Sequence, residues 1–432
     1  MTSTLVLLII FIGLIVVRVP ISITMGIAVL FSLIIGGYSG SLYIIPQQMV
    51  EGVISPALLA IPFFILAANI MNETGLTDKI FDFASALVGH IRGGLAQVNV
   101  VASMIFAGCS GAAVADCAGL GKIEIKAMKD RGYTTDFAAA ITTASSACGP
   151  IIPPSIPMVI YAVIAGVSVG RLFLAGVIPG ILIGVFLMIT NYILSYTMKN
   201  FPPPEKRIPF LKLIKSFSRS FFALIAPVII VGGLVGGFTT AAEAGILATM
   251  YASAVSIIFQ GPRRIIKILP KALFNTAIST VVIMFIIATA TPMGWLIALE
   301  KIPVVIANAI LAFASNKLVF LLLLNIFLLV LGMVVEGIPA LIITAPIFIP
   351  IAREFGIDIV HFGLIMVYGI LIGIATPPMG IGLYIMTQIA DIKFEEVTKA
   401  VLPFLVPLIA VLFLITYVPW TTLFLPDLLM GK

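Results

Sequence analysis

The chain has 432 residues, of which 61% are hydrophobic and only 10% are charged. This balance lies far outside that of soluble globular proteins, so a soluble enzyme or binding module is excluded and an integral membrane protein is indicated. The net charge of +6 does not point to a nucleic-acid partner, because the basic residues fall in short joints between apolar segments, where they mark cytoplasmic loops.

Apolar segments long enough to span a bilayer begin near the N-terminus, and residues 1–53 are predicted to form N-terminal scaffold spans. Residues 5–17 lack the basic region and the cleavage site of a removable signal peptide, so we interpret them as a retained span. The remaining divisions are a first repeat at 54–198, a linker with scaffold spans at 199–271, and a second, inverted repeat at 272–432.

The two predicted repeats share glycines and prolines in one register. Without a gap, GPIIPP at 149–154 falls on GIATPP at 373–378, while Gly108 falls on Gly332 and Pro179 on Pro403. Because these residue types fix backbone geometry, their coincidence indicates a duplication. The basic joints place the open ends of the two units on opposite sides of the membrane, the inverted arrangement of secondary transporters.

Each repeat contains a predicted re-entrant hairpin, at 94–131 in the first and at 317–355 in the second. Two apolar arms of roughly 13–15 residues flank a glycine-rich tip, GCSGAAVAD at 108–116 or GMVVEGIP at 332–339. Such arms rise about 20 Å at 1.5 Å per residue, less than the hydrocarbon core of about 30 Å. The tips are therefore expected near the middle of the membrane.

A span interrupted by prolines follows each hairpin, at 136–165 and at 360–388. In hydrocarbon, a carbonyl freed by proline persists only inside protein or beside a cavity. The ends of a broken helix offer carbonyl oxygens to a cation and amide groups to an anion. We therefore expect Na+ at the breaks, where the available backbone and hydroxyl groups belong to Ser145, Gly149, Ser155, Gly373 and Thr376.

Two carboxylates are predicted at membrane depth, where ionisable groups are functional candidates. Asp116 ends the first tip and Glu336 lies in the second. Each could instead cap the helix that returns from its tip, but a cap does not require a buried charge, so we expect both to act in transport. The residues assigned to substrate binding are Asp116, Ser155, Glu336, Met379 and Gly380.

An enzyme is not expected. An intramembrane enzyme would need a nucleophile with a base, or paired carboxylates. Asp116 and Glu336 could form such a pair, but acid–base chemistry does not require duplicated hairpins, and no catalytic residue is predicted. No phosphate-binding GxxxxGK[ST] loop occurs in the sequence. A passive channel is disfavoured because the tips would block a pore.

Four stretches resemble the large membrane subunit of tripartite ATP-independent periplasmic (TRAP) transporters. They are CSGAAVAD at 109–116, GPIIPPS at 149–155, REFGIDIVHFGLIM at 353–366 and IGIATPPMG at 372–380. The resemblance covers essentially the whole chain and implies an all-α, polytopic elevator fold of the ion-transporter superfamily in the bacterial inner membrane.

The resemblance also implies Na+-coupled symport of a small organic acid, with sialic acid, C4-dicarboxylates and sugar acids all open. It implies two partners, a small four-helix membrane subunit and a periplasmic substrate-binding protein that delivers the acid. The alternative is a stand-alone Na+/dicarboxylate symporter of the same superfamily, which would share the hairpins but need no binding protein.

In family terms, each repeat would hold one Na+ site. The first would use Ser110, Gly111, Gly149 and Ser155, and the second Gly332, Gly337, Gly373 and Thr376. The sequence departs from the family in two places: Ala112 stands where a serine is common, and Glu336 where an aspartate often lies.

Overall fold

The computed structural model describes residues 2–17, 19–198, 201–205, 207, 209–306, 316–378 and 380–431. These residues form helices, turns and irregular segments, with no strand among them. Seven of the described helices are long and apolar enough to cross a membrane. The predicted fold class, an all-α polytopic membrane protein with two inverted repeats of a hairpin and a broken helix, is confirmed.

The chain begins with a series of short helices. In order they are α1 (Thr2–Val16), α2 (Ile21–Ile35), the 3-10 turn η1 (Ser39–Ser41), α3 (Ile44–Val53), the 3-10 turn η2 (Pro56–Leu59), α4 (Ala60–Glu73) and α5 (Leu76–Val88). α1 and α2 have 15 residues each, fewer than the roughly 20 of a typical span. The scaffold role of residues 1–53 stays a prediction.

The same sequence of elements then occurs twice. The first unit consists of α6 (Leu95–Ser110), α7 (Ala113–Asp130), α8 (Thr135–Ser145), η3 (Ser146–Cys148), α9 (Ile156–Ala165) and α10 (Val169–Thr197). The second consists of α15 (Lys317–Val334), α16 (Gly337–Glu354), α17 (Ile359–Leu371), η4 (Ile372–Ala375), α18 (Ile381–Ala390) and α19 (Phe394–Tyr417). In each unit a hairpin precedes a helix that is broken at its prolines.

The hairpin arms are longer than the sequence indicated. They contain 16 and 18 residues in the first unit and 18 each in the second, so each rises roughly 24–27 Å. The glycine-rich tips are helical almost to their ends. Only Gly111 and Ala112 separate α6 from α7, because Gly111 adopts the left-handed conformation (φ +63°) that ends α6.

The two units pack on each other reciprocally. α9 of the first unit contacts the returning arm α16 of the second, and α18 contacts the returning arm α7 of the first. In the same way α19 packs on α8 and α10 on α17. Such exchanged contacts are those of a pseudo-two-fold arrangement, and they bring both tips and both breaks to one place.

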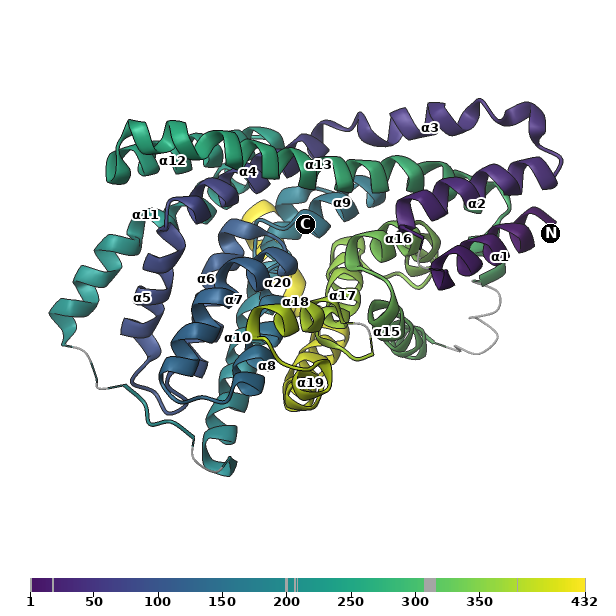
Figure 1. Ribbon diagram of the computed structural model, residues 1–432. Helices are drawn as coiled ribbons and strands as arrows, with labels where there is room; N and C mark the ends of the chain where they lie inside the picture. Colours follow the sequence, from purple (N-terminus) through teal and green to yellow (C-terminus); the bar gives the residue numbers. More distant parts are fainter. Residues whose placement is uncertain are drawn as a thin grey trace.

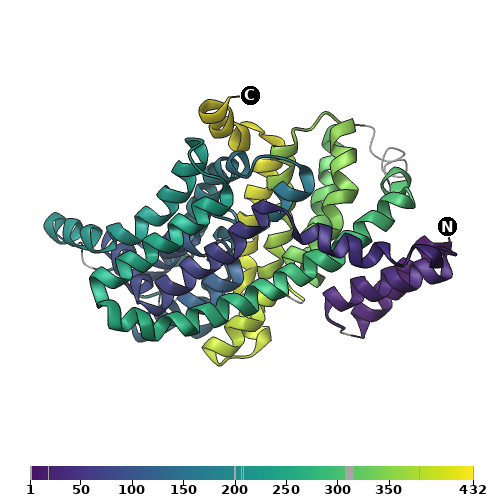
Figure 2. The ribbon, with the colours of Figure 1, turned by 90° about the horizontal axis from the view of Figure 1, so that it is seen from above.

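The remaining helices are α11 (Phe210–Val235), α12 (Ala241–Gln260), α13 (Pro262–Leu299) and α20 (Trp420–Met430). α12 and α13 lie across one side of the molecule (Figure 1), and α13 crosses it as one long helix (Figure 2). α13 contacts α2, α3 and α4 as well as α16. Glu243 forms a capping box with Thr240 at the start of α12.

Candidate functional site

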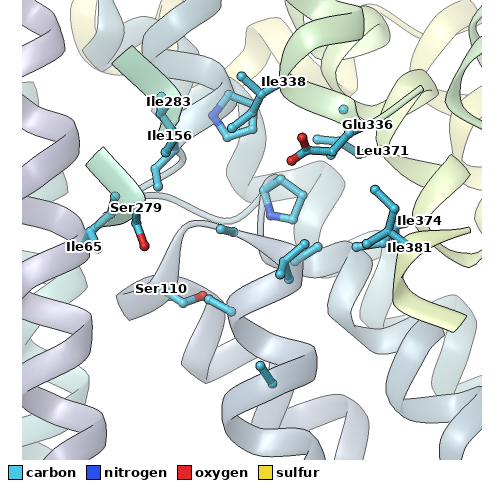
Figure 3. A pocket seen from close by; sticks show the side chains of 18 of the residues that line it. Ile65, Ser110, Ile156, Ser279, Ile283, Glu336, Ile338, Leu371, Ile374 and Ile381 are labelled. Atoms are coloured by element: carbon cyan, nitrogen blue, oxygen red, sulfur yellow. The ribbon is translucent and has the colours of Figure 1, made fainter. Parts of the chain in front are cut away.

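A cavity of about 460 Å³ lies where the two tips and the two breaks meet. α4 and the middle of α13 close it on the other side, so that its walls come from six parts of the chain. Figure 3 shows Ser110, Ser279 and Glu336 on different sides of this space. Of the residues predicted for the site, Ser110, Gly332, Glu336, Gly337 and Gly373 line the cavity.

The first tip brings three predicted residues together. The Ser110 hydroxyl donates a hydrogen bond to Oδ1 of Asp116, which is 1% exposed. Oδ2 of Asp116 has no partner among the described residues, and a Cβ added at Gly149 would lie 2.7 Å from it. Asp116 therefore lies behind the tip, against the first break, and is absent from the described cavity wall.

The first tip is also joined to the start of α9. The Gly111 carbonyl accepts a hydrogen bond from the Ile156 N–H at 3.2 Å. Ser155 caps α9: its hydroxyl accepts from the Met158 N–H at 3.3 Å and donates to the Pro150 carbonyl at 2.6 Å. The Ser155 hydroxyl is thus used by the backbone, and its roles in cation and substrate binding stay predictions.

In the second unit the tip and the break touch through their backbones. A Cβ added at Gly373 would lie 2.0 Å from the Gly332 carbonyl oxygen. The Thr376 hydroxyl donates to the Ile372 carbonyl at 2.8 Å, and Gly380 precedes α18 and is buried. Met379, predicted to bind substrate, lies outside the described residues.

Glu336 is the charged group of the cavity. It occupies the N-cap position of α16, but its side chain makes no capping hydrogen bond, so the capping alternative does not account for it. Its carboxylate instead faces the cavity (Figure 3). Among the described lining residues Glu336 alone is ionisable, and no lysine or arginine is present.

Sequence reasoning missed the polar residues that α4 and α13 contribute. Asn69, Asn72 and Ser279 line the cavity opposite the tips. The Asn69 amide donates to the Thr276 hydroxyl at 2.9 Å, and Oδ1 of Asn72 accepts from Thr77 at 2.6 Å. The available signal was the spacing of two asparagines three residues apart in an apolar helix, which places both on one face.

Ser145, predicted as a Na+ ligand, ends α8 just before the first break and is fully buried. Its hydroxyl donates to Oδ1 of Asn99 at 2.8 Å and accepts from the Ser103 hydroxyl at 2.9 Å. Neither α6 residue was among the predicted site residues. Ser145 therefore belongs to a polar cluster beneath the tip.

The chain is similar to known proteins in its family profile, its sequence and its fold. The profile of the family described as "Tripartite ATP-independent periplasmic transporter, DctM component" matches residues 8–421. The sialic acid TRAP transporter large permease SiaM of Vibrio cholerae is 42% identical over 390 residues, which cover 89% of this chain and 90% of SiaM.

Two further relatives are named for other solutes. The C4-dicarboxylate TRAP transporter large permease DctM of Pseudomonas aeruginosa is 39% identical and covers 86% of each chain. The 2,3-diketo-L-gulonate TRAP transporter large permease YiaN of Escherichia coli is 34% identical, covering 87% of this chain and 88% of YiaN.

The crystal structure of the Alcanivorax borkumensis YdaH transporter shares the fold. Its TM-score is 0.58, at 16% sequence identity, and the match covers 88% of this chain and 89% of YdaH.

Proposed function

Because the chain belongs to the DctM component family of tripartite ATP-independent periplasmic transporters, we propose that it couples Na+ entry to the uptake of a small organic acid. The chain is the large permease of such a transporter, a multi-pass protein of the bacterial inner membrane and not an enzyme.

The single observation that carries the proposal is the charge of the cavity. Its one ionisable described residue is Glu336, and no basic side chain lines the wall. Two like charges 4 Å apart repel by about 4 kcal/mol at an effective dielectric constant of about 20. An anionic solute beside an ionised Glu336 is therefore stabilised by a cation between them, and the carbonyl and hydroxyl oxygens of the tips and breaks are the ligands that Na+ prefers.

The proposed solute is a carboxylate with further polar groups, of the sialic acid, C4-dicarboxylate or sugar-acid classes. Three relatives are named for such acids. The amides of Asn69 and Asn72 and the hydroxyls of Ser110 and Ser279 give the cavity donors and acceptors that suit a substrate rich in hydroxyl or oxo groups. The backbone amides at the start of α16 are suited to the carboxylate.

The proposed movement is that of an elevator. The cavity lies between the hairpin units on one side and α4 with α13 on the other. A displacement of the packed hairpin units along α4 and α13 would carry the tips and breaks together, because these are joined to one another by short backbone contacts. Each net positive charge that enters with the solute contributes about 2.3 kcal/mol per 100 mV.

The family implies a small membrane subunit and a periplasmic binding protein, and we propose that both act with this chain. The test is uptake of labelled sialic acid, C4-dicarboxylates and sugar acids into proteoliposomes that contain the chain with its small subunit, with and without the binding protein and an inward Na+ gradient. Uptake that requires both additions is expected. Uptake by the chain alone would instead establish the stand-alone symporter, and uptake without Na+ would refute the coupling.

A further inference from the structure

A buried carboxyl group, Glu124, lies in the first hairpin and has no role in the mechanism described above. It projects from α7 into the space between α6 and α8, with no exposed surface. Its Oε2 accepts a hydrogen bond from the Asn99 amide at 2.8 Å. Oε1 has no partner among the described residues, and no described ion pair includes Glu124.

Glu124 fixes the orientation of the Asn99 side chain. The amide nitrogen of Asn99 donates one hydrogen to Glu124 and the other to the Thr142 hydroxyl at 2.7 Å. Because an asparagine amide has two donors on its nitrogen and only acceptors on its oxygen, this arrangement turns Oδ1 toward the Ser145 hydroxyl at the end of α8. A flipped amide would place its oxygen against the Glu124 carboxyl oxygen.

The orientation of Asn99 in turn contributes to what Ser145 offers to a ligand. Oδ1 of Asn99 receives the Ser145 hydroxyl hydrogen at 2.8 Å, and the Thr142 carbonyl is a second, more distant acceptor for it at 3.2 Å. Ser103 donates to one lone pair of the Ser145 oxygen at 2.9 Å. A hydroxyl oxygen has two lone pairs, so one remains. With its hydrogen directed away, Ser145 is prepared to coordinate a cation at the end of α8.

We propose that Glu124 is a positioning residue for the Na+ site of the first repeat, acting through Asn99 on Ser145. The inference rests on the proposed Na+ coupling. It applies to one repeat only, because the alignment of the repeats pairs Asn99 with Leu323 and Glu124 with Phe348. Loss of Glu124 therefore weakens one Na+ site and leaves the site of the second repeat unchanged.

The test measures how uptake depends on Na+ concentration in proteoliposomes that contain the complete transporter. E124L and N99L are expected to raise the half-saturating Na+ concentration at least tenfold, with the maximal rate changed less than threefold. E124Q retains a carbonyl oxygen that accepts from Asn99, so its half-saturating concentration is expected within threefold of wild type. Size-exclusion profiles and melting temperatures show which variants fold.

The matched control is N325L. Asn325 is also a fully buried asparagine, whose amide donates to the Thr416 hydroxyl at 3.0 Å between α15 and α19. Its replacement removes a comparable hydrogen bond without touching the Ser145 cluster, so Na+ dependence is expected to stay at the wild-type value. If E124L does not fold, T142V removes the other acceptor of Asn99 at constant side-chain shape and is expected to raise the half-saturating concentration threefold or more.

A double-mutant cycle separates action through Ser145 from a general loss of packing. If Glu124 acts through Ser145, adding E124L to S145A changes the half-saturating Na+ concentration less than twofold. The inference would be overturned if the effects of E124L and S145A on the half-saturating Na+ concentration were additive, or if E124L and N325L had the same Na+ dependence. Neither result would affect the proposed Na+ coupling. Wild-type uptake that needs no Na+ would overturn the coupling and the inference together.

Discussion

The contact between Gly332 and Gly373 gives a sharp prediction about the second tip. An alanine at 373 would place its Cβ 2.0 Å from the Gly332 carbonyl oxygen, and an alanine at 332 would lie 2.3 Å from the Ile370 carbonyl oxygen. Both obstacles are backbone atoms that cannot rotate aside, so the tip must move away from the break. Overpacking of this kind costs about 1–3 kcal/mol, and we expect at least a tenfold loss of uptake because the second Na+ site is pulled apart.

The matched control is Gly232→Ala in α11, where an added Cβ meets nothing within 4 Å and helix propensity favours alanine by up to about 1 kcal/mol. Thermal unfolding in detergent and uptake in proteoliposomes are measured for both variants. Gly373→Ala is expected to unfold at a lower temperature than wild type, and Gly232→Ala at the same or a higher one. A Gly373→Ala protein with the melting temperature and uptake rate of the control would refute the reasoning.

Three further substitutions test the site. Glu336→Gln removes the charge of the cavity without removing a hydrogen bond within the described protein. In uptake assays the half-saturating Na+ concentration should therefore rise at least tenfold, while the melting temperature is unchanged. An unaltered Na+ dependence would contradict a cation beside Glu336. Asp116→Asn keeps an acceptor for Ser110 but loses the charge, and at least tenfold slower uptake in a folded protein is expected; wild-type rates would remove Asp116 from the mechanism. Ser155→Ala loses the cap of α9, so thermal unfolding should show a loss of about 0.5–2 kcal/mol of stability, and uptake should fall less than in Asp116→Asn. If uptake falls more than in Asp116→Asn, Ser155 acts mainly as a ligand.

The positions of the hairpins and breaks could be predicted because glycine and proline determine backbone geometry locally. The coincidence of GPIIPP at 149–154 with GIATPP at 373–378 predicts both breaks, and the structure ends η3 and η4 within two residues of Gly149 and Gly373. The arms are longer than expected because the glycine-rich tips, which indicate irregular backbone, are mostly helical. In the tips most glycines and alanines stay helical, since small side chains let the arms pack closely.

The side-chain environment of the site could not be predicted in the same way. Glu124 lies among Lys122 and Lys126, so the segment reads as a charged joint, yet Glu124 is fully buried while Lys122 and Lys126 are exposed. Which face of α7 is covered depends on α6, α8 and α18, and α18 is far away in the sequence. The same holds for Asn69 and Asn72, whose part in the cavity depends on where α4 meets the tips.

The reciprocal packing of the two units has a consequence for synthesis of the chain. The returning arm α7 is covered by α18, which follows it by more than 200 residues. At about 5–20 residues per second, a ribosome needs on the order of 10–50 s to make this stretch. During that interval the first hairpin is in the membrane without its partner, so lipid or the insertion machinery must shield it. A chain that stops before α18 exposes the surface of α7, which quality-control proteases can recognise.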